Sequence, residues 1–129
     1  MHAAALDVIR AYVAYQDAAL PAESSEFMLV ADEDQRYVGA TRGVTRVLGY
    51  TADELAGRSI ADLAAPPDRE ATPEQWTEFL RDGRQEGVFT LLASDGSAVR
   101  LRFVARAHHP VPGFHTSRLW PEDRGLGPS

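Results

Sequence analysis

Histidines are the side chains of this sequence best suited to chemistry near neutral pH. There are four, and three of them, His108, His109 and His115, lie close together. Imidazole is the commonest metal ligand in proteins. Adjacent residues of a strand point to opposite faces, so His108 and His109 cannot share one ion while the strand continues. Beside two prolines we expect solvated loop histidines and no metal site.

Acidic residues gather at Asp32, Glu33 and Asp34. Paired carboxylates perform acid and base chemistry only where a pocket shifts the pKa of one of them, and a hairpin turn is usually exposed to water. Ser117 near His115 is too weak a pattern to indicate a nucleophile. The sequence contains no nucleophile elbow, phosphate loop or metalloprotease helix motif. We therefore predict no catalytic residue and no enzyme.

Composition excludes several further classes of function. The chain has 129 residues, a formal net charge of -6 and no cysteine. Acidic charge argues against nucleic-acid binding, and the lack of cysteine excludes thiolate metal sites and cysteine-linked chromophores. No apolar run is long enough to span a membrane and no signal peptide is evident, so we expect a cytoplasmic protein. Its basic residues are all arginine, typical of a bacterium with a GC-rich genome.

The N-terminal residues predict an amphipathic helix over 1–20 that ends at Pro21. Its apolar face is formed by Leu6, Ile9, Val13 and Leu20. Residues 27–32 form an apolar strand that should be covered on both faces, and a returning strand follows after an acidic turn. We divide the chain into helix and hinge (1–22), one folded domain (23–121) and a flexible tail (122–129).

The segment GYTADELAGRS, residues 49–59, is dense in helix stop and start signals. Thr41 is expected to cap a short helix that Gly49 ends. Thr51 and Glu54 form a capping box for the next helix, which Gly57 stops. Each of these residues has a backbone role, so the segment is predicted to be scaffold and not a binding site.

The second half of the chain predicts one long helix followed by three strands. Thr72, Pro73 and Gln75 are the expected start of the helix, which stops at Gly83. From Val88 the period becomes that of strands, with a hairpin at SDGS. In the strand after it, alternate arginines at 100, 102 and 106 face away from the core.

These residues resemble the PAS sensor-domain family. The resemblance rests on FMLVADEDQRYVGATRGVTRVLGYTADELAGRSIADL, on PPDR and on LLASDGSAVRLRF, and spans about residues 27–120. It implies an α+β fold in which short helices close one face of a five-stranded antiparallel sheet around a small cavity. Thr41 stands where the family often has Asn, and Gln35 where it often has Gly; a longer turn can avoid the positive φ that Gly supplies.

The resemblance also bears on cofactors. Flavin-binding light sensors and photoactive yellow proteins of this family use cysteine, which is absent here. Haem-binding members commonly use a histidine of the longest helix, and residues 68–83 contain none, so haem at that place is not expected. The identity of any cofactor stays open.

Helix and strand periodicity selects a set of apolar residues as the wall of the cavity. We expect these residues to serve mainly to fill the core. If a ligand binds among them, it should be apolar or flat. The predicted lining is Met28, Val47, Leu63, Trp76, Phe79, Leu80, Phe89, Leu91, Leu101 and Phe103.

We expect a non-catalytic sensory or regulatory module of signal transduction that binds a small apolar ligand. A homodimer through the N-terminal helix and the outer sheet face is expected, against a monomer whose helix seals its own sheet. The protein signalling partner is unknown. Two alternatives remain: a small cone-shaped α+β isomerase or hydrolase, and a packed-core dimerisation or docking module in which Arg100, Arg102 and Arg106 meet an acidic partner.

Overall fold

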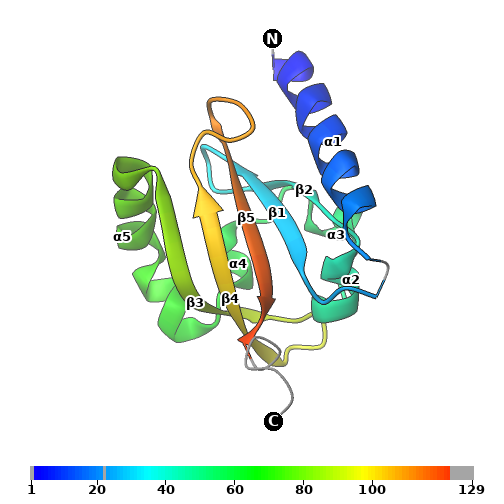
Figure 1. The fold of residues 1–129 in the computed structure, drawn as a ribbon. Helices are drawn as coiled ribbons and strands as arrows, with labels where there is room; N and C mark the ends of the chain where they lie inside the picture. Colours follow the sequence, from blue (N-terminus) through cyan, green and yellow to red (C-terminus); the bar gives the residue numbers. More distant parts are fainter. Residues whose placement is uncertain (1, 22, 123–129) are drawn as a thin grey trace.

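A computed structural model describes residues 2–21 and 23–122 of the chain (Figure 1). Its elements, in chain order, are α1 (His2–Ala19), β1 (Phe27–Asp32), β2 (Tyr37–Ala40), α2 (Gly43–Leu48), α3 (Ala52–Leu55), α4 (Ile60–Leu63), α5 (Pro66–Asp82), β3 (Arg84–Leu92), β4 (Ala98–Arg106) and β5 (Phe114–Pro121).

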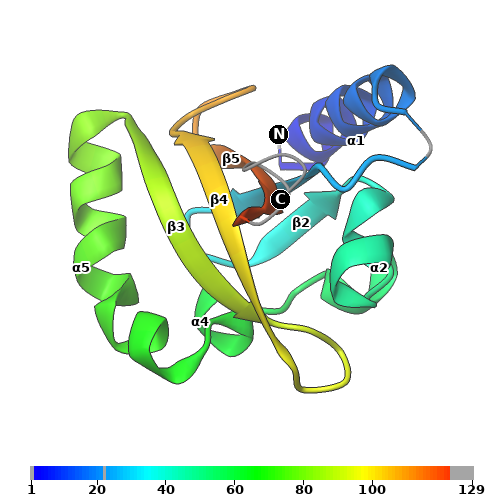
Figure 2. The same ribbon diagram turned by 60° about the horizontal axis from the view of Figure 1, so that its bottom comes forward.

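The five strands form one antiparallel sheet in the order β2-β1-β5-β4-β3. The last strand of the chain therefore lies in the middle and pairs with the first. Figure 2 shows α2, α4 and α5 on one side of the curved sheet and α1 on the other. We call these sides the inner and the outer face. The predicted fold class is confirmed.

Two separate hydrophobic clusters hold the layers together. The inner cluster joins β1, β4 and β5 to the short helices, and Phe27, Val44 and Leu101 in it are fully buried. The outer cluster is smaller and joins α1 to the sheet through Ile9 and Val30. Burial of such side chains contributes roughly 1.5–3 kcal/mol each.

The helix ends and starts predicted for GYTADELAGRS are confirmed. Gly49 ends α2 at φ 84°, and Gly57 follows α3 at φ 85°. Thr51 accepts a hydrogen bond from the Glu54 amide, and the Glu54 carboxylate accepts one from the Thr51 amide. Ser59 caps α4 in the same way. None of these residues lines the cavity described below.

The predicted start of the long helix is wrong. Helix α5 begins at Pro66, and Pro73 lies inside it. A proline in the first turn costs no hydrogen bond, so Pro66 is itself a good start. The Thr72 hydroxyl donates to the Asp68 carbonyl oxygen within the helix instead of capping its start.

Two further expectations about the first hairpin are also corrected. Thr41 does not cap α2, whose N-cap is Arg42; it extends the pairing of β1 with β2. Its amide donates to the Met28 carbonyl oxygen, and its hydroxyl accepts from the Met28 amide at 2.9 Å. Gln35 adopts φ 62°, so the turn does use a positive φ without glycine.

The predicted tail, apart from Glu122, lies outside the described residues. The hinge between α1 and β1 contains Ala22, which also lies outside them. In the described part of the chain no helix has both the length and the apolar character needed to cross a membrane.

Replacing Thr41 with Val tests its role in closing the hairpin. Thr41 is 0% exposed, so Val keeps the shape but leaves the buried Met28 N–H without this acceptor. We expect the free energy of unfolding to fall by about 2 kcal/mol, measured by urea denaturation. Thr77→Val on the exposed face of α5 is the control, with an expected change within about 0.5 kcal/mol. Equal effects of the two substitutions would contradict this role.

Candidate functional site

The inner face of the sheet and α5 enclose a cavity of about 100 Å³ that is partly open to solvent. Helix α5 is fastened over it by backbone and side-chain hydrogen bonds to β3. The Thr90 amide donates to Asp68 Oδ2 at 2.6 Å, and the Ala65 amide donates to the Thr90 carbonyl oxygen at 3.0 Å. Asp68 is therefore the residue that positions the start of this wall.

Half of the predicted lining residues line this cavity: Trp76, Phe79, Phe89, Leu91 and Phe103. The remaining apolar positions of the set lie elsewhere in or beside the core. Leu63 and Leu101 are fully packed within the inner cluster, Val47 packs against it from α2, and Leu80 is partly buried on α5.

Met28 is the one predicted lining residue on the wrong face of the sheet. It pairs with Arg118 of β5 and lines a groove on the outer face. Its neighbour Leu29 lines the cavity instead. A strand that is apolar on both faces gives no sign of which alternate residues point inward, so a choice of the wrong alternation moves a side chain to the other side.

The cavity is more polar than predicted. Thr72, Gln75, Gln85, His115 and Ser117 contribute to its wall beside the aromatic residues. The Ser117 hydroxyl and the Gln75 side-chain amide form no hydrogen bond with any described residue. These groups are available to a ligand, whereas no carboxylate or guanidinium lines the cavity.

His115 is the most constrained polar side chain of the site and was expected to be solvated. It is 3% exposed, and its ring contacts Trp76 and Phe79 edge to face. Nε2 lies 2.7 Å from Glu33 Oε1 in the turn between β1 and β2. Nδ1 accepts a hydrogen bond from the backbone amide of His108 at 3.0 Å. Both ring nitrogens are thus occupied.

These partners determine the protonation state of His115. An amide N–H can only donate, so Nδ1 carries the lone pair and the single proton of the neutral ring is on Nε2, where it is donated to Glu33. Burial lowers the pKa of His115 below its ordinary value, and the hydrogen bond to Glu33 and its charge oppose this shift. Near neutral pH the ring is therefore neutral.

The same arrangement does not suit a metal ion. Ligand atoms of Glu33, His108 and His115 lie within 4.8 Å of one another. However, His108 Nδ1 also accepts from a backbone amide, that of Gly113, at 2.9 Å. Both rings then carry a proton on Nε2. A metal-bound histidine instead donates its second nitrogen to an acceptor, so this cluster is built for hydrogen bonding.

On the outer face, α1 covers β1 and β2 and leaves β4 and β5 open (Figure 1). Of the predicted interface residues, Ile9 is 0% exposed and Leu6 and Val13 pack against it, all facing the sheet of their own chain. Leu20 is partly buried. The large apolar residues that α1 does expose are Val8 at 46% and Tyr15 at 74%.

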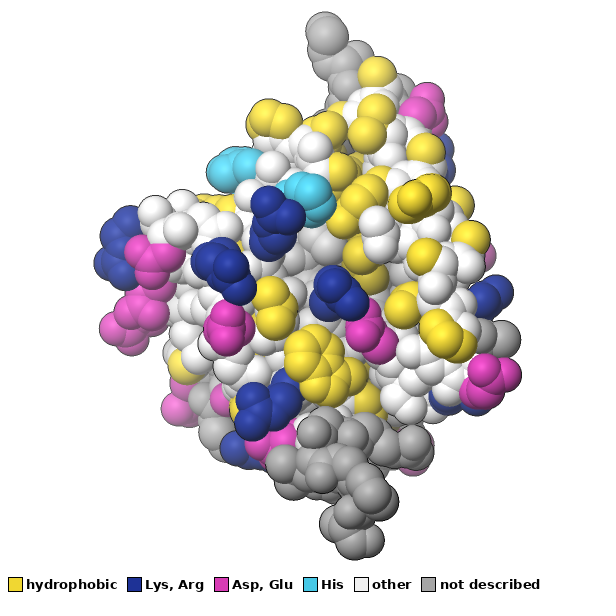
Figure 3. Space-filling model, viewed as in Figure 1, with side chains coloured by type: hydrophobic (Ala, Val, Ile, Leu, Met, Phe, Trp, Pro, Cys, Tyr) yellow, Lys and Arg dark blue, Asp and Glu magenta, His cyan; other side chains and the backbone are white. Residues whose placement is uncertain are grey.

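Beside α1 lies an outer groove of about 650 Å³, lined by residues that include Tyr12, Met28 and Trp120. Figure 3 shows basic side chains over the strands and hydrophobic ones along α1. Arg118 pairs with Glu26, and Arg100 Nε lies 2.7 Å from Glu122. Arg102 and Arg106 form no ion pair with any described residue. Tyr12 and His109 close one end, with 3.0 Å between the hydroxyl and Nε2.

Sequence reasoning missed the pairing of His115 with Glu33 because the residues are 82 positions apart. The available signal was the strand pattern of residues 114–121, in which His115, Ser117 and Leu119 alternate on one face. That alternation would have placed His115 on the same face as Leu119, towards the core.

A family model described as PAS fold matches residues 14–107. The matched segment begins within α1 and ends just after β4. No curated protein matches the chain.

Solved structures share the fold. The PAS domain of a protein from Colwellia psychrerythraea has a TM-score of 0.70 at 16% identity, covering 87% of this chain and 98% of that one. The PAS-B domain of Drosophila melanogaster Cycle, solved with bound ethylene glycol, has a TM-score of 0.66 at 17% identity, covering 74% and 98%. A blue-light activated histidine kinase of Erythrobacter litoralis has a TM-score of 0.60 at 14% identity, covering 75% of this chain and 33% of the kinase.

Replacing Asp68 with Ala tests the attachment of the cavity wall. The Thr90 amide loses a charged acceptor, so we expect the free energy of unfolding to fall by about 2 kcal/mol, with Asp68→Asn losing less. Urea denaturation measures both variants. Glu70→Ala, two residues further along α5 and exposed, is expected to change stability by no more than about 0.5 kcal/mol. If Asp68→Ala left the free energy of unfolding unchanged, α5 would be held by its apolar face alone.

Proposed function

The chain belongs to the PAS family, whose domains are typically sensory, and we propose that it is a non-catalytic sensor that binds a small neutral ligand in its inner cavity and pairs with a second copy through α1. The observation that carries this proposal is the mixed lining of the cavity. The cavity is lined by aromatic side chains and by the side chains of Ser117 and Gln75, which have no hydrogen-bond partner among the described residues. No charged group lines it.

The size of the cavity limits the ligand. An apolar cavity of about 150 Å³ holds benzene, and this one measures about 100 Å³ before any adjustment of its walls. A molecule of about four or five non-hydrogen atoms fits by this comparison. Without a charged group in the wall, burial of an ion would be costly. A neutral molecule with one hydrogen-bonding group, such as a small amide or alcohol, is therefore the best match.

The state of His115 supports a role without catalysis. A general base needs a free lone pair directed at the substrate, and Nδ1 of His115 is already occupied by the His108 amide while Nε2 faces Glu33. The isomerase or hydrolase alternative needs such a group deep in the pocket. A binding function requires only the neutral wall.

The surface for pairing differs from the predicted one. Leu6, Ile9 and Val13 face their own sheet, so we place the contact on the opposite side of α1. Ala4, Val8, Ala11 and Tyr15 recur there at helical spacing and are exposed. We call these four residues the α1 stripe. Contact between the stripes of two copies would bury Val8 and Tyr15.

Ligand binding is tested by NMR titration with propionamide and 2-propanol, using propionate as the charged counterpart. We expect millimolar affinity for the neutral probes, given the ceiling of about 1.5 kcal/mol per non-hydrogen atom, with signal changes at Ser117 and Phe103. Ala105→Leu fills the cavity and should weaken binding at least tenfold, whereas Ala98→Leu at the exposed start of β4 should not. Absence of binding, or equal binding by both variants, would contradict a ligand site.

Pairing is tested by sedimentation of the wild type and two charge-matched variants. Val8→Glu combined with Tyr15→Glu places two carboxylates in the stripe and should raise the dimer dissociation constant at least tenfold. Arg10→Glu changes the net charge equally on another side of α1 and should leave it within threefold. A monomeric wild type at 100 µM, or dimers in all three proteins, would refute pairing through this stripe.

A further inference from the structure

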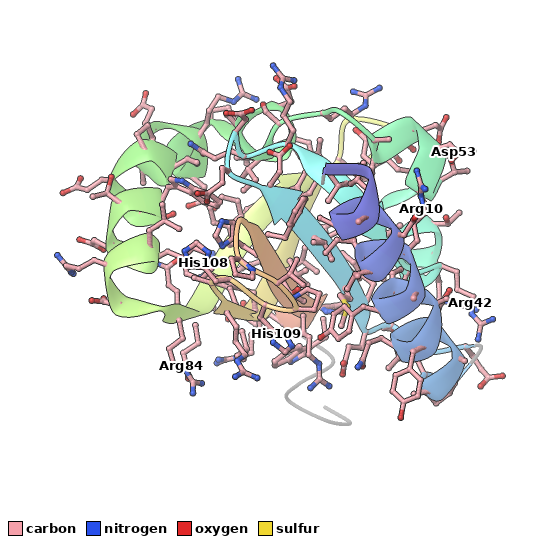
Figure 4. The ribbon with its side chains drawn as sticks, turned by 90° about the horizontal axis from the view of Figure 1, so that it is seen from above. Arg10, Arg42, Asp53, Arg84, His108 and His109 are labelled. Carbon is pink, nitrogen blue, oxygen red and sulfur yellow. The ribbon has the colours of Figure 1, made fainter. Side chains whose placement is uncertain are left out.

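The loop between β4 and β5, residues 107–113, contacts both faces of the sheet. Figure 4 shows His108 and His109 projecting from it between α5 and α1. On the inner side, the His108 amide donates to His115 Nδ1. On the outer side, the His109 ring meets Tyr12 of α1 edge to face, and Val111 packs with Phe114 against Ile9. The loop thus joins the buried histidine to the N-terminal helix.

A second proton on His115 is incompatible with this loop position. It would be added at Nδ1, the nitrogen that now accepts from the His108 amide at 3.0 Å. Two N–H groups would then point at each other, and a partly buried amide would lose its acceptor. Nε2 would keep its hydrogen bond to Glu33, and the attraction between them would grow because the ring would be charged. Protonation therefore favours release of the loop while the ring stays bound to Glu33.

We propose that this domain senses acidity through His115: a proton on Nδ1 breaks the hydrogen bond from the His108 amide, frees the 107–113 loop and loosens its contacts with α1. In this proposal the signal is a proton that binds at His115 Nδ1, and not a molecule in the cavity. The inference does not depend on the neutral ligand or on pairing, because all of its groups belong to one chain and lie beside the cavity.

The groups that face His115 place the transition on the acidic side of neutrality. Burial lowers its pKa most, and the adjacent His108 lowers it further; the hydrogen bond to Glu33, its charge and the charge of Asp32 raise it. Helix α5 contributes the uncharged Trp76 and Phe79. Since the closed form disfavours a proton on Nδ1, the closed loop is favoured at higher pH and is lost as the pH falls.

The loop also contains two other imidazoles, which any test must separate from His115. His108 is exposed, and its Nδ1 accepts from the Gly113 amide. His109 bonds Tyr12, and its pKa is lowered by burial and by Arg106. Asn removes the titrating imidazole at each position. At His108 and His115 its Oδ1 also stands near the position of Nδ1 and can accept the same hydrogen bond.

The test is NMR of the full chain between pH 8 and 5, following the three imidazoles and amide exchange. In the wild type we expect the protection factor of the His108 amide to fall by up to tenfold per pH unit as the pH is lowered towards the observed midpoint of His115, since one proton is bound on release. Tyr12 signals should shift with the same midpoint. His115→Asn should abolish both changes, whereas His108→Asn and His109→Asn should retain the change at residue 108.

Glu33→Gln provides an independent variant if His115→Asn does not fold. Removal of the carboxylate charge should lower the midpoint of His115 and of the loop change together. A constant His108 protection factor in the wild type would overturn the proposal. It would equally be overturned if the change persisted in His115→Asn, disappeared in His108→Asn, or kept its midpoint in Glu33→Gln.

Discussion

The pairing of β5 with β1 is the interaction on which the rest of the structure depends. Its register sets Ala31 opposite His115 and Met28 opposite Arg118. Because side chains alternate, a shift of one residue in β5 would exchange its side chains that face the cavity with those that face the groove. The same register therefore determines which side chains of β1 and β5 line the inner cavity and which line the outer groove. Both sites form only when the last strand pairs with the first.

Features that depend on a few neighbouring residues could be predicted from the sequence. The Thr51–Glu54 capping box and the left-handed Gly49 were identified because each is complete within one turn. Where two local signals competed, the pattern could not choose. Both Pro66 and the Thr72–Gln75 segment are good helix starts. The earlier one is used, and in the helix that begins there Asp68 bonds to β3.

The candidate site was only partly predictable for a related reason. Periodicity identified Trp76 and Phe79 on α5, since one face of a long helix is evident from spacing. It could not place Met28, whose strand is apolar on both faces, and it could not show that Glu33, in an exposed acidic turn, reaches His115. That contact exists because the β1–β2 turn and the start of β5 meet at one end of the sheet, which local sequence does not specify.

The separation of the two faces also restricts how the cavity can influence α1. A paired strand in the middle of a sheet has its backbone groups held on both sides, so it transmits little displacement through its thickness. The 107–113 loop lies beyond the ends of β4 and β5. There, beside backbone bonds such as that from the His109 amide to the Phe114 carbonyl oxygen, several backbone groups are held by side chains: the His108 amide by His115, the Gly113 amide by His108, and the His109 carbonyl oxygen by the Thr116 hydroxyl. Side-chain acceptors can change with protonation, whereas carbonyl acceptors cannot. The end of the sheet, and not its centre, is therefore where an event at the inner face reaches the outer helix.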